Sequence, residues 1–271
     1  MIEPWEVHVD AYPSADSDLL FTITVSWTTS HPTPTQFWFS RVMYPTEAEK
    51  AVIEAAEDIM VETMARYDPS HDAYHVRRVR KTALKIAQNV PSRPDMLVVE
   101  LAALLHDVLD KKYVSADDAA DPYRFFLPFF ESMAAQHGID LVQDGRGRLI
   151  AQVIDNVSWT TEKKLKEKGL WTTWHEKCVE LHCVQDADRL DAIGAFGIMR
   201  CAAYSAVTNN ALYAPVGDPK QPRSAIQHFH DKLVHIRDRL KTEYGQRLGA
   251  KRHRVLLDFI AAVEEEHEGG D

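Results

Sequence analysis

The sequence has little cysteine, no long apolar run and no basic start, and each shortage argues against a class of protein. Three cysteines make an odd count without a C-x-x-C spacing, which favours reduced thiols in the cytoplasm over a disulfide framework. No apolar run approaches the ~18 residues of a membrane span. Acidic residues stand where a signal peptide has its basic region, so we expect neither a membrane nor a secreted protein.

The chain also lacks an excess of positive charge. Its 271 residues carry a formal net charge of −10, which argues against a general nucleic-acid binder. An acidic protein that handles phosphorylated substrates needs a local device, such as a metal ion or a few placed Lys and Arg side chains. The composition, 45% hydrophobic and 27% charged, suits one large globular domain or two small ones.

The first 45 residues differ from the rest of the chain. The stretch LLFTITVSW (19–27) is rich in β-branched and aromatic residues, and SHPTPT (30–35) is typical of a turn or an extended linker. We therefore predict an N-terminal extension over 1–45, either irregular or with a short strand or hairpin, followed by a core domain over 46–268.

Helical patterns dominate that core. The segment 45–67 opens with Pro and acidic residues, 71–90 is stopped by Pro91, and 94–110 is apolar on nearly all sides, as in a central buried helix. Further helices are predicted over 122–137, 147–157, 173–184, 188–206, 224–242 and 250–268. The prediction is an all-α fold with many helices around one core.

The stretch ELAALLHDVLDKKY (100–113) places His106 and Asp107 directly after a run of core-type residues. A carboxylate is seldom fully buried unless it is paired or bound to a metal. The chain has two other His-Asp pairs. His71-Asp72 precedes a helix that Asp72 could cap, and His230-Asp231 lies in a charged amphipathic helix. Only the pair at 106–107 is embedded in an apolar helix.

Two other segments offer partners for this pair. His75 shares a helix face with Val79 and Ile86, so it faces inward, although such a histidine is more often a hydrogen-bonded core residue than a ligand. Asp186, Asp188 and Asp191 crowd what we predict to be the start of a helix, where one aspartate suffices as a cap. A cation would relieve their mutual repulsion.

Together these residues make a mixed nitrogen and oxygen set that suits one divalent transition metal. Adjacent residues on a helix point about 100° apart, so His106 and Asp107 both reach a metal only if it lies between them at the helix surface. Two other helices must then bring one ligand each.

Three motifs in this order resemble the HD-domain metal-dependent phosphohydrolase superfamily: H-x-x-R-V at 75–79, A-x-L-L-H-D at 102–107 and A-D-R-L at 187–190. A fourth motif, SAIQHFHDKL at 224–233, belongs to the narrower similarity that follows. Within the superfamily, roughly residues 50–265 are similar to small bacterial YpgQ-type nucleotide pyrophosphohydrolases. The resemblance implies an HD-domain helical bundle that hydrolyses a phosphoanhydride or phosphate ester bond in a nucleotide.

The resemblance also implies roles for individual residues. The metal ligands would be His75, His106, Asp107 and Asp188, with Asp186 as the alternative to Asp188. We expect Mn²⁺, with Mg, Co, Ni, Fe and Zn as alternatives. Asp110 would orient the attacking water or take its proton, and Lys111 would meet the charge on the phosphates. The candidate substrate contacts are His71, Arg78, Lys112, Asp186, His228 and Lys232.

Two other functions are open alternatives. A di-iron HD-type oxygenase needs further histidine ligands, for which His137, His175 and His182 are available in the sequence. The second alternative is an inactive domain that binds a nucleotide without cleaving it. The oligomeric state is open as well, with a homodimer as one option.

Overall fold

The N-terminal residues form a unit of their own. The computed structural model describes residues 6–13, 19–26 and 37–38 by their backbone, and residues 44–109, 115, 117 and 120–269 with their side chains. The chain divides into two compact units, Met1–Thr46 and Glu47–Asp271.

The first unit is a small antiparallel sheet. Strands β1 (Glu6–Pro13), β2 (Leu19–Ser26) and β3 (Phe37–Trp38) lie in the order β1-β2-β3. The β1-β2 hairpin pairs Glu6 with Ser26 and Pro13 with Leu19. The β-rich pattern of 19–27 therefore does form a strand, as one of the two options for this region predicted.

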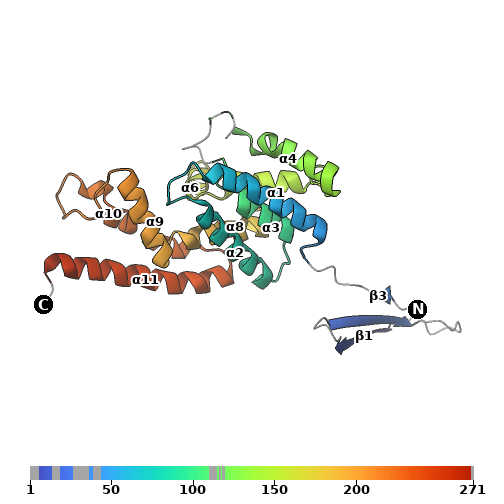
Figure 1. Cartoon of the computed structure of the whole chain (residues 1–271). Coiled ribbons are helices and arrows are strands. Elements are labelled where there is room, and N and C mark those ends of the chain that lie inside the picture. The colour runs from blue at the N-terminus through green and yellow to red at the C-terminus, as the bar shows by residue number, and fades with distance from the viewer. Residues whose placement is uncertain are drawn as a thin grey trace. The chain divides into compact units, whose positions relative to one another are not determined.

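The second unit is helical, which confirms the predicted all-α core (Figure 1). Its helices are α1 (Glu47–Met64), α2 (Ala73–Asn89), α3 (Met96–Leu105), α4 (Pro122–His137), α5 (Arg146–Asn156), α6 (Trp159–Glu167), α7 (Thr173–Lys177), α8 (Val179–Asp191), α9 (Gly194–Val207), α10 (Ala225–Asp231) and α11 (Glu243–Glu268). The part of this unit that the structure describes also contains the 3-10 turns η2 (Gln221–Arg223), η3 (Leu233–His235) and η4 (Arg237–Arg239).

Helix α3 is the centre of the core, as its apolar sequence predicts. Every residue of Leu97–Leu105 is buried, and the helix packs against α1, α2, α5 and α8. Asp95 begins it by accepting hydrogen bonds from the backbone N–H groups of Leu97 (3.0 Å) and Val98 (3.1 Å). No single helix in the described part of the chain is long and apolar enough to span a membrane.

Two predicted boundaries near the C-terminus are wrong. The segment 224–242 is not one helix, because α10 ends at Asp231 and the turns η3 and η4 follow it. Helix α11 begins at Glu243, ahead of the predicted residue 250, because the Thr242 side chain accepts from the Gly245 N–H (3.0 Å) and caps it. The amphipathic pattern was read correctly, but the local cap decides where the chain restarts its helix.

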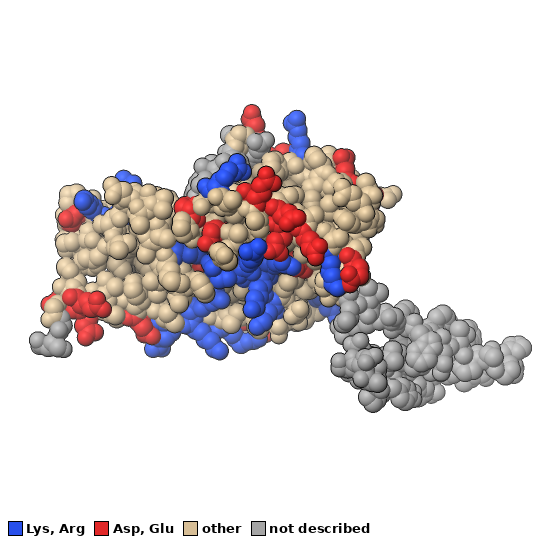
Figure 2. All heavy atoms as spheres, viewed as in Figure 1, with Lys and Arg blue, Asp and Glu red and all other residues tan. Residues whose placement is uncertain are grey.

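Charge is distributed unevenly over the helical unit. Helix α2 carries Arg77, Arg78, Arg80, Lys81 and Lys85 and no acidic residue. Figure 2 shows Lys and Arg gathered over α2 and the first half of α11, with acidic side chains over α1. The two kinds are partly paired, since Glu57 of α1 accepts from Arg77 (2.8 Å) and Arg80 (2.7 Å). The net charge of −10 therefore does not describe the surface around α2.

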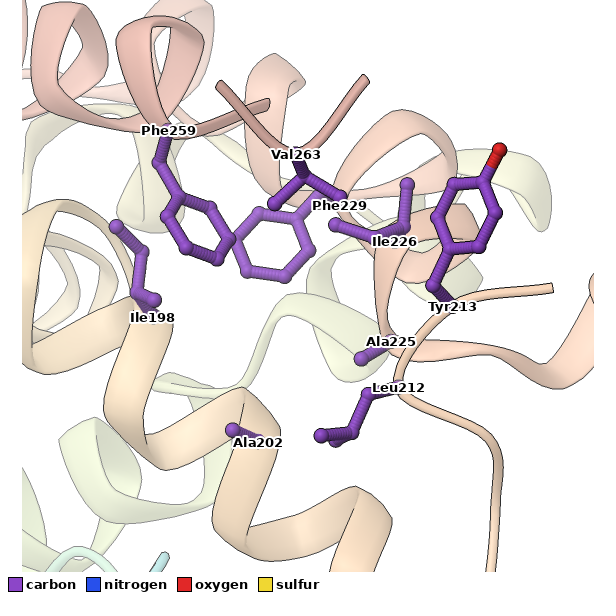
Figure 3. Close-up of a pocket in the computed structure, with 9 residues that line it drawn as sticks. All are labelled: Ile198, Ala202, Leu212, Tyr213, Ala225, Ile226, Phe229, Phe259 and Val263. Atoms are coloured by element: carbon purple, nitrogen blue, oxygen red, sulfur yellow. The ribbon is translucent and has the colours of Figure 1, made fainter. Parts of the chain in front are cut away.

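An apolar cavity of about 200 Å³ lies between α9, α10 and α11 (Figure 3). The rings of Phe229 and Phe259 lie side by side in its lining, with centroids 5.7 Å apart, and Ile198 and Ala202 of α9 form another wall. None of the predicted site residues lines this cavity.

Helix α6, which the sequence did not predict, is anchored by a buried carboxylate. The Glu162 side chain is only 2% exposed and accepts from Lys166 (2.6 Å), Arg189 (2.6 Å) and Lys241 (3.0 Å). Burial by itself raises the pKa of Glu162, but the three cations lower it from 4.5 to about 2. The cluster ties α6 to α8 and to the turn before α11.

Replacing Glu162 by Gln should lower the free energy of unfolding at pH 7 by about 3 kcal/mol, because the buried Arg189 and the largely buried Lys241 lose their counter-charge together with Lys166. The carboxylate's contribution is present above its unfolded pKa of 4.5 and disappears as the pH falls through about 2. Thermal unfolding of wild type and E162Q between pH 7 and pH 2 measures both effects. E167Q is the control, because Glu167 is 61% exposed in the same helix. Equal losses in the two variants would contradict the anchoring role.

Candidate metal centre

Helix α2 turns His75 into the core. Asp72 begins the helix by accepting a hydrogen bond from the His75 N–H (2.8 Å), so the predicted capping role of Asp72 is confirmed. From that start, His75, Val79, Ala83 and Ile86 fall on the buried face. The His75 side chain is 1% exposed.

His106 and Asp107 lie where helix α3 ends, and not within it. The helix finishes at Leu105, and residues 106–109 continue as turns. The His106 Nδ1–H donates to the Ala103 carbonyl (2.8 Å), which fixes the imidazole over the last turn of the helix. The Tyr67 hydroxyl lies 3.5 Å from the Asp107 carbonyl oxygen and supports the turn. Because His106 and Asp107 lie after the end of the helix, their adjacent side chains can face the same point.

The aspartates of the third segment belong to the end of a helix, which corrects the prediction. Helix α8 runs from Val179 to Asp191, so Asp186, Asp188 and Asp191 lie in its last turns and not at the start of a helix. Carboxylates are unfavourable at a helix C-terminus, so tertiary partners must hold them there. Each of the three faces a different partner.

Four side chains from these segments converge. His75 Nε2 lies 3.4 Å from Asp107 Oδ2 and 3.6 Å from Asp188 Oδ1. His106 Nε2 lies 3.4 Å and 3.9 Å from the same two oxygens. The ligand atoms of His75, His106 and Asp188 all lie within 4.8 Å of one another, a spacing that could hold a metal ion.

The hydrogen bonds of the two imidazoles fix which nitrogen faces the centre. Nδ1 of His75 donates to Asp191 Oδ2 (2.7 Å), and Nδ1 of His106 donates to a carbonyl. In the neutral ring, each Nε2 therefore carries a lone pair. Both Nε2 atoms are buried without a hydrogen-bond partner among the described residues. Two lone pairs facing two carboxylates require a positive charge between them.

The pKa values reflect the same demand for positive charge. Burial lowers the pKa of His106, but Asp107 and Asp188 outweigh it and raise that pKa to about 9. Burial likewise raises the pKa of Asp107, yet His106 and His75 hold it well below its ordinary value. Either a proton or a metal ion can supply the charge, and two imidazole nitrogens with two carboxylates fit a divalent transition metal.

The sequence of this chain matches that of a known protein family. Residues 72–193 match the model of the HD domain. The chain is 32% identical over 206 residues to YpgQ of Bacillus subtilis, covering 74% of this chain and 86% of YpgQ. The chain belongs to the HD-domain family. The predicted resemblance is thereby confirmed.

Solved HD-domain structures share the fold. The crystal structure of Bacillus subtilis YpgQ in complex with ADP is 25% identical, with a TM-score of 0.59, and the match covers 81% of this chain and 96% of that one. An HD-superfamily hydrolase from Bacillus thuringiensis is 26% identical, with a TM-score of 0.60, over 81% of this chain and 98% of its own. Both matches leave part of this chain uncovered.

In this HD domain, Asp191 organises the residues behind His75. Besides the His75 Nδ1–H, it accepts a bidentate pair from Arg78 (2.8 and 2.9 Å) and a bond from Arg200 (3.3 Å). Burial raises the pKa of Asp191, but His75 and Arg78 outweigh it and hold that pKa well below its ordinary value. Arg78, a predicted substrate contact, is thus engaged with Asp191, and its guanidinium also lies 4.2 Å from the centroid of the Phe196 ring.

Sequence reasoning named Asp191 but gave it no role. A signal was present in the spacing, because Asp191 follows Asp188 by one helical turn and Arg78 follows His75 by one turn. This spacing allows Arg78 and Asp191 to meet where two helices bring His75 and Asp188 together.

Asp186 has a structural position away from the four convergent side chains. It is fully buried and accepts hydrogen bonds from the Thr242 N–H (2.8 Å), the Thr242 hydroxyl (2.7 Å) and the Lys241 N–H (2.9 Å). Burial raises the pKa of this carboxyl. A Cβ on Gly245 would stand 2.4 Å from Asp186 Oδ2, so only glycine fits there. Asp186 joins α8 to the start of α11.

The remaining predicted residues are distributed as follows. The His71 ring lies edge-on to the His75 ring, with centroids 6.3 Å apart. His228 lies in α10, and Lys232 directly follows that helix. Burial of the His228 ring and the nearby charge of Lys232 lower the pKa of His228. Asp110, Lys111 and Lys112 lie outside the described residues.

Mn²⁺ should stabilise the metal-free protein by mass action, because the four side chains converge only in the folded chain. At 100 times the dissociation constant the gain is about 2.7 kcal/mol, a rise in Tm of roughly 5–10 °C. Differential scanning fluorimetry with added Mn²⁺ and then EDTA measures it. D188N should lose most of the response, whereas D258N, an exposed site in α11, should keep it. No response in the metal-free wild type would contradict the site.

Proposed function

We propose that this chain is a metal-dependent phosphohydrolase that acts on nucleotides. The convergence of two imidazole Nε2 atoms and two carboxylates on one point carries the proposal. The relation to HD-superfamily hydrolases supports the reaction class. The ADP bound to YpgQ supports a nucleotide as the substrate.

His75, His106, Asp107 and Asp188 would hold the divalent ion, with Mn²⁺ as our first choice. When bound, such an ion polarises a phosphate oxygen and acidifies a water molecule. The protein contributes rigidity, because both imidazoles are held through Nδ1 and are buried. A site that is already ordered loses little conformational freedom when it binds.

The site is open on its carboxylate side. The side chains of Asp107 and Asp188 are 20% and 28% exposed, whereas those of His75 and His106 are 1% and 2% exposed. Water and substrate would therefore approach past the two aspartates. We propose that Asp110 orients the water or takes its proton, and that Lys111 and Lys112 meet the phosphates, because all three follow directly on Asp107 and the turn at 106–109.

An oxygenase reaction has less support from the structure. Two of its candidate extra ligands have structural hydrogen bonds: His175 Nε2 bonds to Asn156 Oδ1 (3.1 Å), and His182 Nε2 bonds to the His175 carbonyl (2.8 Å). Among the described residues, one group of side chains has metal-ligand spacing, and it contains neither histidine. A single centre favours hydrolysis over di-iron chemistry.

A panel of nucleoside di- and triphosphates with Mn²⁺ tests the function. Wild type should release phosphate or pyrophosphate, and D107N should lose more than about 100-fold in kcat/KM, because losing a ligand costs more than losing a ligand's partner. D155N, an exposed change in α5, should retain activity. Binding of a nucleotide without release by wild type would favour the inactive module. Two metals per chain with oxygen consumption would favour the oxygenase.

A further inference from the structure

One guanidinium connects the loop before α2 with the end of helix α8, behind the metal centre. Arg200 comes from α9, and its side chain is 14% exposed. Its Nε donates to the backbone carbonyl of Ser70 (2.6 Å), in the loop before α2. Its Nη1 donates to Asp191 Oδ2 (3.3 Å), at the end of α8. Arg200 therefore joins the consecutive helices α8 and α9 to the loop before α2, which lies 130 residues earlier in the sequence.

The first connection leads to the metal ligand His75. The oxygen of Asp191 that accepts from Arg200 is also the oxygen that accepts from His75 Nδ1 (2.7 Å) and from Arg78 Nη2 (2.9 Å). A carboxylate with three donors on one oxygen has a single orientation. The imidazole held by it keeps its Nε2 directed at Asp107 and Asp188.

The second connection leads to His71. Ser70 is 1% exposed, and its hydroxyl donates to Asp68 Oδ1 (2.5 Å). Because that proton is given to Asp68, the Ser70 oxygen accepts from His71 Nδ1 (2.7 Å). The loop position of Ser70 thus determines the position of the His71 ring, which lies beside the ring of His75.

We propose that Arg200 is a positioning residue that holds His75 for the metal and His71 for the substrate phosphates at the same time. The metal half follows from the Asp191 contacts alone. The substrate half rests on the proposed function and on the sequence prediction that His71 contacts the nucleotide.

Arginine is required for this double contact. Its planar fork presents donors to two acceptors in fixed directions, whereas a lysine ammonium is a single point charge on a flexible stem. The two acceptors also differ in kind, one a backbone carbonyl and the other a carboxylate. A lysine at the same position would have to reach both acceptors with a single nitrogen.

Two affinities measured by titration calorimetry test the proposal: that for Mn²⁺ alone, and that for ADP at saturating Mn²⁺. R200M should weaken both by about 3- to 10-fold, since partners behind metal ligands commonly contribute 10- to 100-fold and Arg78 still holds Asp191. R200K keeps the positive charge and serves as the second variant if R200M does not fold. It should weaken at least one of the two affinities. R247M, an exposed arginine in α11, is the matched control and should change neither.

Two further variants separate the two connections. D191N should weaken Mn²⁺ binding by about 10- to 100-fold and leave ADP affinity at saturating Mn²⁺ within two-fold of wild type. S70A removes the hydroxyl that holds His71 and should weaken only ADP binding. In the double variant R200M/S70A, ADP affinity should fall no further than in S70A, because Arg200 acts on His71 through Ser70.

Arg200 variants with both affinities within two-fold of wild type would overturn the proposal. Loss of only one affinity in R200M would overturn the double role. Both affinities are measured without turnover, so a wild type that binds Mn²⁺ and ADP but releases no phosphate would refute the proposed function and leave this test intact. A wild type that does not bind ADP would overturn the substrate half.

Discussion

Two imidazole lone pairs and two carboxylates, placed together at the edge of a hydrophobic core, are the constraint on which the rest of the structure depends. Without a cation this arrangement is repulsive, and burial strengthens the repulsion because little water screens it. The fold can tolerate it only if other contacts hold each side chain in place. The capped start of α2, the terminated end of α3 and the last turns of α8 provide those contacts.

The metal centre and the structural ion pairs use different aspartates of helix α8. Asp188 faces the centre, whereas Asp191, one turn later, faces Arg78 and Arg200, and Asp186 faces the turn before α11. Three aspartates at the unfavourable end of one helix therefore each have a favourable partner. This distribution explains how a helix C-terminus can carry such a density of negative charge.

The helical faces were predictable from the sequence, and the helix ends were not. The spacing of His75, Val79 and Ile86 correctly placed His75 inside, and the motif order suggested which segments meet. The aspartates of α8 were misplaced because local rules assign acidic residues to helix starts, whereas here tertiary partners override the rule. Arg200 was not identified because its acceptors, Ser70 and Asp191, leave no local pattern around it.

The most direct test of the metal centre is an anomalous difference map from a crystal grown with Mn²⁺. The account predicts one strong peak per chain, within about 2.0–2.4 Å of His75 Nε2, His106 Nε2 and a carboxylate oxygen from each of Asp107 and Asp188. A map with no peak there, or a chain with two peaks among these side chains, would contradict a single-ion hydrolytic centre.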